Sequence, residues 1–251
     1  MERYVDPKAS LGQGTTVGYF SVIGPDVRVG RDCTIGNNVV IHKGTVIGDR
    51  VRIDDGSVVG KLPMKAATSA TTDGKAVPAA QIADDCLIGA CVVVYAGCRL
   101  GHHVLVADLA SVREDVAIGD YTIVGRGVTV ENRCTIGRYC KLESECYITA
   151  YSELGDRVFV APGVATSNDN FIGRTKERFE HFKGVTVEKG GRIGTGCVIL
   201  PGKTVGADAV VAAGSVLTND APPRKVVMGA PARVKKDVPK EQLLENQGWK
   251  D

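Results

Sequence analysis

The sequence predicts an all-β protein, a parallel solenoid whose short strands and turns repeat every six residues. Three features of the 251-residue chain carry this prediction: an aliphatic side chain at every sixth position, a small residue directly after most of them, and only two interruptions of the register. The first unbroken series is Val5, Leu11, Val17, Ile23, Val29, Ile35, Ile41, Ile47, Ile53 and Val59. Strands this short cannot bury their faces alone, so successive hexads must stack as coils.

The same register resumes after each interruption. The second series is Ile82, Ile88, Val94, Leu100, Val106, Val112, Ile118, Val124, Val130, Ile136, Leu142, Ile148, Leu154 and Val160, and the third is Val187, Ile193, Ile199, Val205, Val211 and Leu217. The glycines that often follow the aliphatic residue, such as Gly12, Gly18 and Gly24, predict a turn with unusual backbone angles at that position. Each hexad is therefore expected to form a short strand and a corner.

Seven of the eight cysteines lie four positions after an aliphatic residue, where the other occupants are small. They are Cys33, Cys86, Cys98, Cys134, Cys140, Cys146 and Cys197. Because a free cysteine packs as a small hydrophobic side chain, we interpret them as interior spacers rather than as metal ligands or disulfide partners. No C-x-x-C pair is present, and unpaired thiols fit a reducing cytoplasm.

Composition narrows the class of protein further. The hydrophobic content is 43%, but only 5% of residues are aromatic, which suits a narrow solenoid that cannot hold bulky rings. The net charge of +2 gives no indication of a nucleic acid or membrane partner. The first residues, MERYVDPKASLGQG, lack an apolar stretch of signal-peptide length, so we expect a soluble, cytoplasmic protein.

The hexad pattern over residues 5 to 236 resembles the hexapeptide-repeat acyltransferase superfamily, whose members form left-handed, three-sided parallel β-helices. The resemblance implies coils of 18 residues, about ten in all, and an acyltransferase domain over residues 1–236. Residues 237–251 are then expected to form a tail with a short helix. It also implies a homotrimer with active sites between parallel subunits.

Two segments leave the register, at residues 65–81 and 172–186. Residues 82–171 between them number 90, or five coils of 18, so both loops are expected to leave the same edge of the prism. At the spacing of β-strands they would lie roughly 24 Å apart along the axis. A long, thin ligand could therefore lie between them.

Polar residues replace the expected turn glycines along one edge. In successive coils, the residues that directly follow the aliphatic residue at this edge are Asp6, Gly24, His42, Gly60, Tyr95, Arg113, Glu131, Thr149 and Ser167. Arg113 and Glu131 are candidate substrate-binding residues, with a corner salt bridge between them as the structural alternative. Glu143 stands in another column made otherwise of Gly and Ala, and it is a candidate proton acceptor.

The second loop contains Phe179 and Phe182, and such an aromatic loop is expected to cover a ligand, pack on another subunit or plug the prism. The stretch from "VAPGVATSNDNF" to "VILPG" resembles nucleotide-sugar N-acetyltransferases that act on 3-amino-3,6-dideoxyhexoses, and such a role belongs to polysaccharide biosynthesis. This resemblance makes Asn168 and Asp169 candidate catalytic residues. The substrate-binding candidates it adds are Asn170 and Arg174.

The segment "RLGHHVLVAD" at 99–108 resembles the histidine segment of the N-acyltransferase of lipid A synthesis, in which a histidine is the general base. By this match His102 is the alternative catalytic residue. Its column also contains Asp84, Asp120 and Arg138, so a line of stacked surface charges explains it equally well. With only four histidines, two of them adjacent, a three-histidine zinc site is not expected, and we predict no metal.

The proposed donor is acetyl-coenzyme A, because the sequence ends in a proline-rich extension similar to that of the acetyl-coenzyme A branch of the superfamily. Candidate ligands for its phosphates are Lys203, Arg233, Lys235 and Lys236. The predicted activity is N-acetylation of a nucleoside-diphosphate-linked aminosugar. The alternatives are an acyl carrier protein-dependent N-acyltransferase that uses His102 and a non-enzymatic scaffold solenoid.

Overall fold

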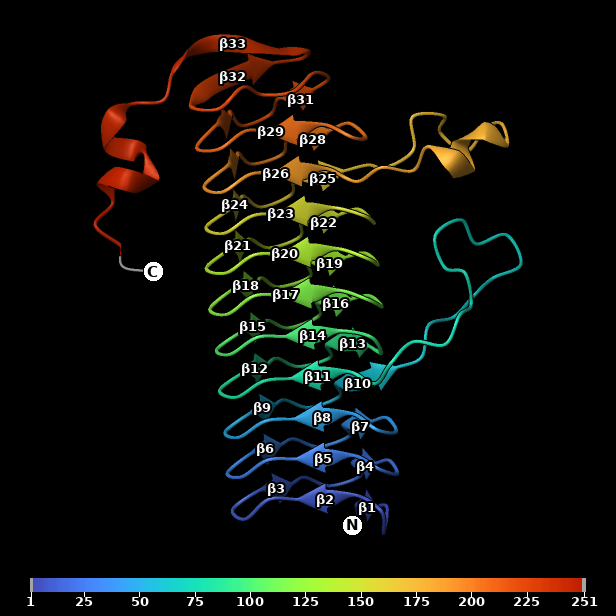
Figure 1. Ribbon diagram of the computed structural model, residues 1–251. Coiled ribbons are helices and arrows are strands. Elements are labelled where there is room, and N and C mark those ends of the chain that lie inside the picture. The colour runs from blue at the N-terminus through green and yellow to red at the C-terminus, as the bar shows by residue number, and fades with distance from the viewer. Residues whose placement is uncertain (1, 250–251) are drawn as a thin grey trace.

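Each coil of the protein places one short strand on each of three faces, which we call faces A, B and C (Figure 1). The structure is a computed structural model and describes residues 2–249. Face A consists of β1 (Tyr4–Val5), β4 (Val22–Ile23), β7 (Val40–Ile41), β10 (Val58–Lys61), β13 (Val93–Tyr95), β16 (Ser111–Val112), β19 (Thr129–Val130), β22 (Tyr147–Ile148), β25 (Ala165–Thr166), β28 (Val198–Ile199) and β31 (Val216–Leu217).

Faces B and C complete each coil. Face B consists of β2 (Ser10–Leu11), β5 (Arg28–Val29), β8 (Val46–Ile47), β11 (Gln81–Ile82), β14 (Arg99–Leu100), β17 (Ala117–Ile118), β20 (Thr135–Ile136), β23 (Glu153–Leu154), β26 (Thr186–Val187) and β29 (Thr204–Val205). Face C consists of β3 (Thr16–Val17), β6 (Thr34–Ile35), β9 (Arg52–Ile53), β12 (Leu87–Ile88), β15 (Leu105–Val106), β18 (Ile123–Val124), β21 (Lys141–Leu142), β24 (Phe159–Val160), β27 (Arg192–Ile193), β30 (Val210–Val211), β32 (Lys225–Gly229) and β33 (Ala232–Asp237).

The register of these faces confirms the prediction from the hexads. Outside the loops and the C-terminal strands β32 and β33, strands pair in parallel with partners 18 residues away, as Ser111 of β16 does with Thr129 of β19. The second residue of a strand points inward, so Ile23, Ile88 and Leu142 are almost fully buried. The fold is therefore the predicted all-β, left-handed parallel β-helix, and face B contains ten strands.

The glycines after the aliphatic residues serve a different purpose from the one predicted. Gly12 and Gly18 do not have a positive φ, but a Cβ atom on either would lie 2.5 Å from the backbone of the next coil. Close approach between coils, rather than a turn with unusual angles, therefore requires glycine there. Positive φ angles occur two residues after these glycine positions, and non-glycine residues such as Asp32 and Arg50 adopt them.

The cysteine slot links successive coils. All seven cysteines predicted to be interior are buried, and Cys91, outside the slot, is exposed. The Cys98 thiol donates to the Arg113 carbonyl oxygen at 2.9 Å, and the Thr15 hydroxyl, in the same slot, donates to the Gly30 carbonyl at 2.8 Å. The spacer interpretation is confirmed, and the slot also supplies hydrogen-bond donors.

Both loops leave the corner between faces A and B, as predicted. Loop 1 comprises residues 62–80, between β10 and β11, and loop 2 comprises residues 167–185, between β25 and β26, with the 3-10 turn η1 (Glu177–Glu180). Figure 1 shows loop 1 rising beside the stack toward loop 2. We call the corners between faces A and B, from β10 to β28, the loop edge.

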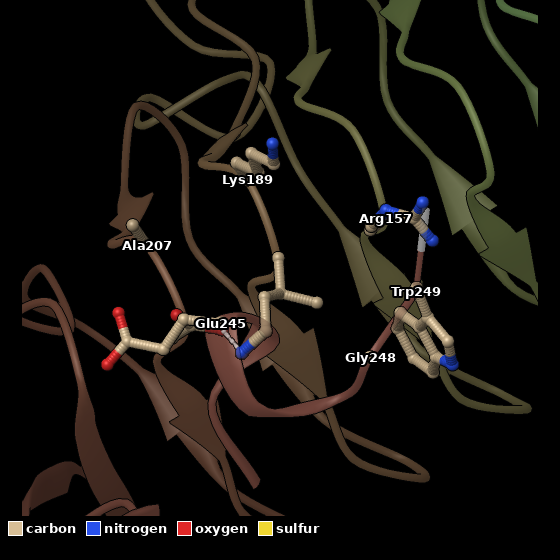
Figure 2. A pocket seen from close by; sticks show the side chains of 8 residues that line it. Arg157, Lys189, Ala207, Glu245, Gly248 and Trp249 are labelled. Carbon is tan, nitrogen blue, oxygen red and sulfur yellow. Dashed lines mark hydrogen bonds between the residues drawn. The ribbon is translucent and has the colours of Figure 1, made fainter. Parts of the chain in front are cut away.

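The C-terminal part differs from the prediction of a single short helix after residue 236. Strands β32 and β33 form an antiparallel hairpin that extends face C, and β33 runs to Asp237. Two 3-10 turns follow, η2 (Lys240–Gln242) and η3 (Leu244–Asn246). This tail folds back on the corner between faces B and C, where Arg157 lies 5.2 Å from the Trp249 ring (Figure 2). Between residues 2 and 249 no helix is long and apolar enough to cross a membrane.

Candidate functional site

A cluster of polar side chains lies on the loop edge beneath loop 1. Arg113 donates to the Glu114 carboxylate at 2.9 Å and to Glu131 at 3.3 Å, and its third partner is the Thr72 hydroxyl of loop 1 at 3.1 Å. The corner salt bridge between Arg113 and Glu131 is thus confirmed. Burial disfavours the Arg113 cation, but the two carboxylates outweigh burial and raise its pKa above the ordinary value.

Loop 1 is held against the edge three coils above its exit. Arg133, at the corner after β19, contacts the Asp73 carboxylate of loop 1 at 2.6 Å and donates to the Tyr151 hydroxyl at 3.2 Å. Asn132 is fully buried and donates its side-chain amide to the Thr71 carbonyl at 2.9 Å. Its Oδ1 atom is buried and has no hydrogen-bond partner, so the edge retains one unused acceptor.

These contacts shorten the open part of the loop edge. The loops leave the stack five coils apart, as expected, but loop 1 covers the edge as far as Arg133. Between Arg133 and the base of loop 2 only the corner after β22 then remains, and these two limits lie roughly 10 Å apart at the usual strand spacing. The residues at this opening are Tyr151, Ser167 and Asn168.

Asn168, Asp169 and Asn170 form the base of loop 2, beside an open pocket of about 660 Å³. Asp169 accepts the backbone N–H groups of Phe171 at 2.9 Å and Gly173 at 3.0 Å. Its Oδ2 atom also lies 3.2 Å from Arg178. Partial burial would raise the pKa of Asp169, but these N–H groups and the Arg178 charge outweigh it and lower the pKa. The Asp169 carboxylate therefore stabilises the conformation of loop 2.

The aromatic residues of loop 2 pack around Arg178. The guanidinium lies 5.0 Å from the Phe179 ring and 5.4 Å from the Phe182 ring, and these two rings meet edge to face. Phe179 nevertheless remains 55% exposed. The loop is thus a small folded unit that still presents apolar surface, and Arg174 is exposed on it.

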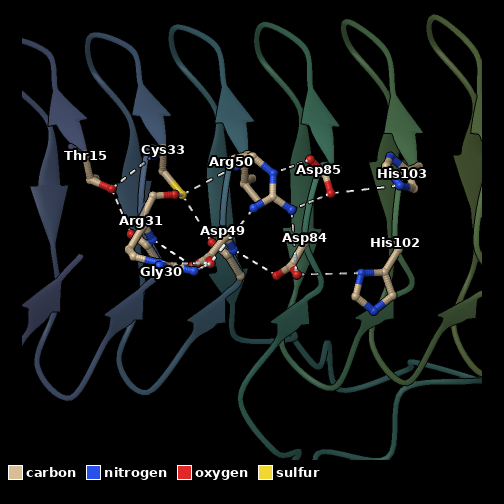
Figure 3. A network of polar contacts seen from close by, with 12 residues as sticks. Thr15, Gly30, Arg31, Cys33, Asp49, Arg50, Asp84, Asp85, His102 and His103 are labelled. Atoms are coloured by element: carbon tan, nitrogen blue, oxygen red, sulfur yellow. Dashed lines mark hydrogen bonds and ion pairs between the residues drawn. The ribbon is translucent and has the colours of Figure 1, made fainter. Parts of the chain in front are cut away.

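Glu143 and His102 lie at the other two edges of the prism. Glu143 follows β21 at the corner between faces C and A, and His102 follows β14 at the corner between faces B and C. His102 belongs to a ladder of charges (Figure 3): its Nδ1 atom is 4.0 Å from Asp84, and its backbone N–H donates to Asp120 at 2.8 Å. Its column therefore forms the predicted line of stacked charges, and within one chain the four catalytic candidates do not converge.

The four candidate coenzyme A ligands lie in two places. Lys203 is half-buried on the loop edge between β28 and β29, next to Gly202, whose N–H donates to the Lys183 carbonyl of loop 2 at 3.1 Å. Arg233, Lys235 and Lys236 are exposed on β33 at the end of the stack. Among these residues, only Lys203 lies beside loop 2.

Two profiles of known families match segments of the stack. The profile of the bacterial transferase hexapeptide, six repeats, matches residues 8–43, and the hexapeptide repeat of succinyl-transferase matches residues 26–61 and 184–219. The matched segments therefore consist of hexapeptide repeats of the kind found in these transferases. These matched segments are runs of the coils described above, on both sides of the two loops.

Two curated relatives match parts of this hexapeptide-repeat chain. The galactoside O-acetyltransferase of Escherichia coli is 34% identical over 89 residues, which are 34% of this chain and 43% of the relative. The dTDP-3-amino-3,6-dideoxy-alpha-D-galactopyranose 3-N-acetyltransferase of Aneurinibacillus thermoaerophilus is 45% identical over 56 residues, 22% of this chain and 29% of the relative. The chain thus spans less than half the length of these relatives.

Among solved structures, the UDP-N-acetylglucosamine acyltransferase of Arabidopsis superposes on this hexapeptide-repeat protein with a TM-score of 0.62. The superposition covers 98% of this chain and 75% of the other, at 18% sequence identity. At this identity the similarity concerns the fold. The long solenoid is therefore an architecture known from experiment.

Three residues of the loop edge in this hexapeptide-repeat protein were not predicted from its sequence: Asn132, Arg133 and Tyr151. Along this edge only the position directly after each aliphatic residue was considered, whereas these residues lie two or three positions after it. A comparison of those positions along the edge would have shown large polar side chains there. Their contacts with loop 1 could not be inferred, because the hexads do not specify the path of a loop.

Proposed function

We propose that this protein transfers the acetyl group of acetyl-coenzyme A to the amino group of a nucleoside-diphosphate-linked aminosugar of the 3-amino-3,6-dideoxyhexose type. The observation that carries the proposal is the opening on the loop edge, bounded by the Arg133–Asp73 contact and by Asn168 at the base of loop 2. The relative from A. thermoaerophilus, which is named for this reaction, supports the choice of substrate.

Acetyl transfer to a neutral amine does not require a strong base from the enzyme. The neutral amine nitrogen attacks the thioester carbonyl carbon, the C–S bond breaks, and the proton lost by nitrogen is transferred to the thiolate, giving an amide and a free thiol. Acetyl-coenzyme A supplies the activated acetyl group. We assign Asn168 the role of orienting the amine, because its half-buried side chain borders the pocket. Backbone N–H groups at the corner can stabilise the oxyanion.

The other candidates take supporting roles in this proposal. Asp169 holds loop 2 in shape through Phe171, Gly173 and Arg178, and so acts as a positioning residue. Asn170 and Arg174 extend the substrate site along loop 2. Arg113 and Glu131 lie beneath loop 1, below the opening, and we propose that they support the substrate site from there. The proton of the amine reaches the thiolate through water.

The donor site is proposed at Lys203. Lys203 follows Gly202, which the carbon chain of Lys183 approaches, and we assign both lysines to the phosphates of coenzyme A. Arg233, Lys235 and Lys236 remain candidates only if a neighbouring subunit brings the hairpin of β32 and β33 to this edge. The unpaired cysteines support a cytoplasmic location, where the thioester is made.

We also propose a homotrimer in which face A lies at the subunit contact. Apart from Lys61 at the end of β10, the outward positions of the face A strands carry no charged residue, whereas faces B and C carry Arg28, Glu153 and Lys141. Tyr4, Val22, Tyr147 and Val198 are exposed on face A. Such a surface is typical of a protein interface. Light scattering should give about three times the 26.5 kDa of the chain, and a monomer would contradict the assignment.

The reaction is tested by measuring coenzyme A release with a thiol reagent against a panel of nucleotide-linked aminosugars. Each aminosugar is paired with the same sugar bearing a hydroxyl group in place of the amine, and acyl carrier protein thioesters are tested as donors. Release that depends on the amine and on acetyl-coenzyme A supports the proposal. Transfer only to hydroxyl groups, or only from the carrier protein, would contradict it, and the second result would favour the alternative that uses His102.

A further inference from the structure

A cavity of about 300 Å³ lies between face C and the C-terminal tail, on the side of the prism away from the loop edge. Face C contributes Lys141, Phe159 and Arg192, the neighbouring corner contributes Tyr139 and Arg157, and the tail contributes Gln242, Leu244 and Trp249. The tail is held in place because the Leu244 N–H donates to Asp208 at 3.2 Å and Arg224 pairs with Glu245 at 2.8 Å. The cavity is therefore part of the folded chain.

Arg192 is incompletely satisfied within this cavity. Its Nη1 atom donates to Gln242 Oε1 at 3.2 Å, but its Nη2 atom is buried and has no hydrogen-bond partner among the described residues. Asp208 attracts the Arg192 cation, yet burial outweighs that attraction and lowers its pKa. A buried guanidinium N–H without an acceptor costs free energy, and an anionic ligand would offset that cost.

The strand register places an aromatic ring between two cations. Lys141 pairs with Phe159, and Phe159 pairs with Arg192, so the three outward side chains occupy consecutive strands of face C. At the usual strand spacing, the two cations start roughly 10 Å apart. Trp249 stacks on Arg157, whose guanidinium also lies 4.5 Å from the Tyr139 ring, so further aromatic surface borders the cavity.

The charges and rings together define a class of ligand. Three cations, Lys141, Arg157 and Arg192, line the cavity against two carboxylates, Asp208 and Glu241. Asp208 is already used by the Leu244 backbone. Cations suit phosphate oxygens, and aromatic faces suit a planar heterocycle.

We propose that the cavity between face C and the C-terminal tail binds the nucleoside phosphate part of a ligand, with the phosphates on Arg192 and Lys141 and the base on Phe159 and Trp249. The same chemistry occurs in a free nucleoside diphosphate and in the adenosine 3′,5′-bisphosphate end of coenzyme A. The proposal rests on this cavity alone and stands whether or not acetyl transfer occurs at the loop edge.

The single tryptophan of the chain provides the measurement, because Trp249 borders the cavity. Adenosine 3′,5′-bisphosphate, ADP and UDP are titrated into the full-length protein, with fluorescence excited at the red edge of tryptophan absorption. Equilibrium dialysis with labelled nucleotide excludes inner-filter effects. Saturable quenching is expected with a nucleotide, and none is expected with adenosine, uridine or inorganic phosphate over the same range. A preference for the bisphosphate over UDP would identify coenzyme A as the source, and the reverse would identify a nucleoside diphosphate.

Two variants make the assignment specific. Arg192→Gln and Lys141→Gln should each weaken binding by about tenfold, the effect of losing one charged contact. Arg99→Gln, an outward residue of face B, is the matched control and should bind as the parent does. Thermal unfolding verifies that all three variants are folded. Absence of saturable binding by every nucleotide, or binding unaffected by both cavity variants, would overturn the proposal.

Discussion

The guanidinium of Arg133 lies 2.6 Å from the carboxylate of Asp73, although 60 residues separate them in the chain. This ion pair attaches loop 1 to the stack three coils above its exit, and it defines the lower limit of the opening on the loop edge. Because both side chains are about one-third exposed and solvent screens their charges, the pair is expected to contribute little to the free energy of unfolding.

Asp73→Asn should therefore release loop 1 only partly. We expect trypsin to cleave after Lys65 or Lys75 faster than in the parent, by up to about fivefold, because local opening precedes cleavage. Mass spectrometry of a cleavage time course gives the rates. Glu145→Gln removes a comparable exposed ion pair, with Arg126, away from loop 1 and should leave the rates unchanged. Equal acceleration in both variants would mean that Asp73 does not hold the loop.

The two candidate centres can be separated by substitution. Asn168→Ala should lower turnover by about 100-fold, equivalent to about 2.7 kcal/mol of barrier, because it removes the group proposed to orient the amine. His102→Ala and Glu143→Gln, at the other edges, should each stay within about threefold of the parent, or under about 1 kcal/mol. Steady-state rates of coenzyme A release measure these effects. A large loss in His102→Ala with Asn168→Ala nearly intact would move the centre to the corner between faces B and C.

Asp169 should make the structure of loop 2 sensitive to acid. Its pKa in the folded protein is lowered, so its contribution is present above the ordinary carboxyl pKa of about 4 and is lost as the pH falls through the lower folded value. Amide hydrogen exchange at Phe171 and Gly173 should therefore stay slow near neutral pH and, after correction for intrinsic rates, lose protection only below pH 4. Asp169→Asn should lose part of this protection at every pH, and unchanged protection would contradict the role.

Lys203→Ala is expected to raise the KM for acetyl-coenzyme A by about tenfold, the effect of losing one charged contact, and to change kcat little. Arg28→Ala on face B serves as the control, because it removes an exposed cation far from loop 2. Initial rates over a range of donor concentrations distinguish the two parameters. A KM equal to that of the parent would remove Lys203 from the donor site.

Only one thiol should react rapidly in the folded protein. Burial disfavours the thiolate and raises the pKa of Cys98, Cys134 and Cys146 to about 12, and that of Cys86 and Cys140 to about 11. Because the thiolate is the nucleophile, these groups should be inert at pH 8, while exposed Cys91 reacts. A maleimide reaction followed by mass spectrometry should show one label before unfolding and eight after it. Several fast labels in the folded protein would contradict the buried positions.

The coil architecture could be predicted because each hexad repeats the same pattern of an aliphatic residue followed by a small one. A hexad that departs from the pattern can still be placed from the hexads on either side of it. The position of both loops on one edge could be predicted because the 90 residues between them make five whole coils of 18. The role of Gly12 could not be obtained in this way, because its constraint comes from the backbone of the next coil rather than from its own φ angle. Periodicity thus specifies the stack but not the reason for each residue.

The candidate site was less predictable, because it depends on segments that leave the repeat. Arg113 and Glu131 lie in the stack, and their ion pair was anticipated from their spacing. The contact of Arg133 with Asp73 depends on the path of loop 1 along the edge. The contact of Asp169 with Arg178 likewise depends on the fold of loop 2. The position of Trp249 likewise depends on the path of the tail.

The exits of the two loops are separated by a whole number of coils, which makes the reach of the site adjustable in steps. Duplicating one 18-residue coil between β19 and β25 would preserve every corner and move loop 2 outward by one strand spacing, about 4.8 Å. A deletion of the same length would close the opening by the same amount. A solenoid of this kind can therefore change the length of molecule it accepts by gaining or losing identical units, while the side chains at each end of the opening stay the same.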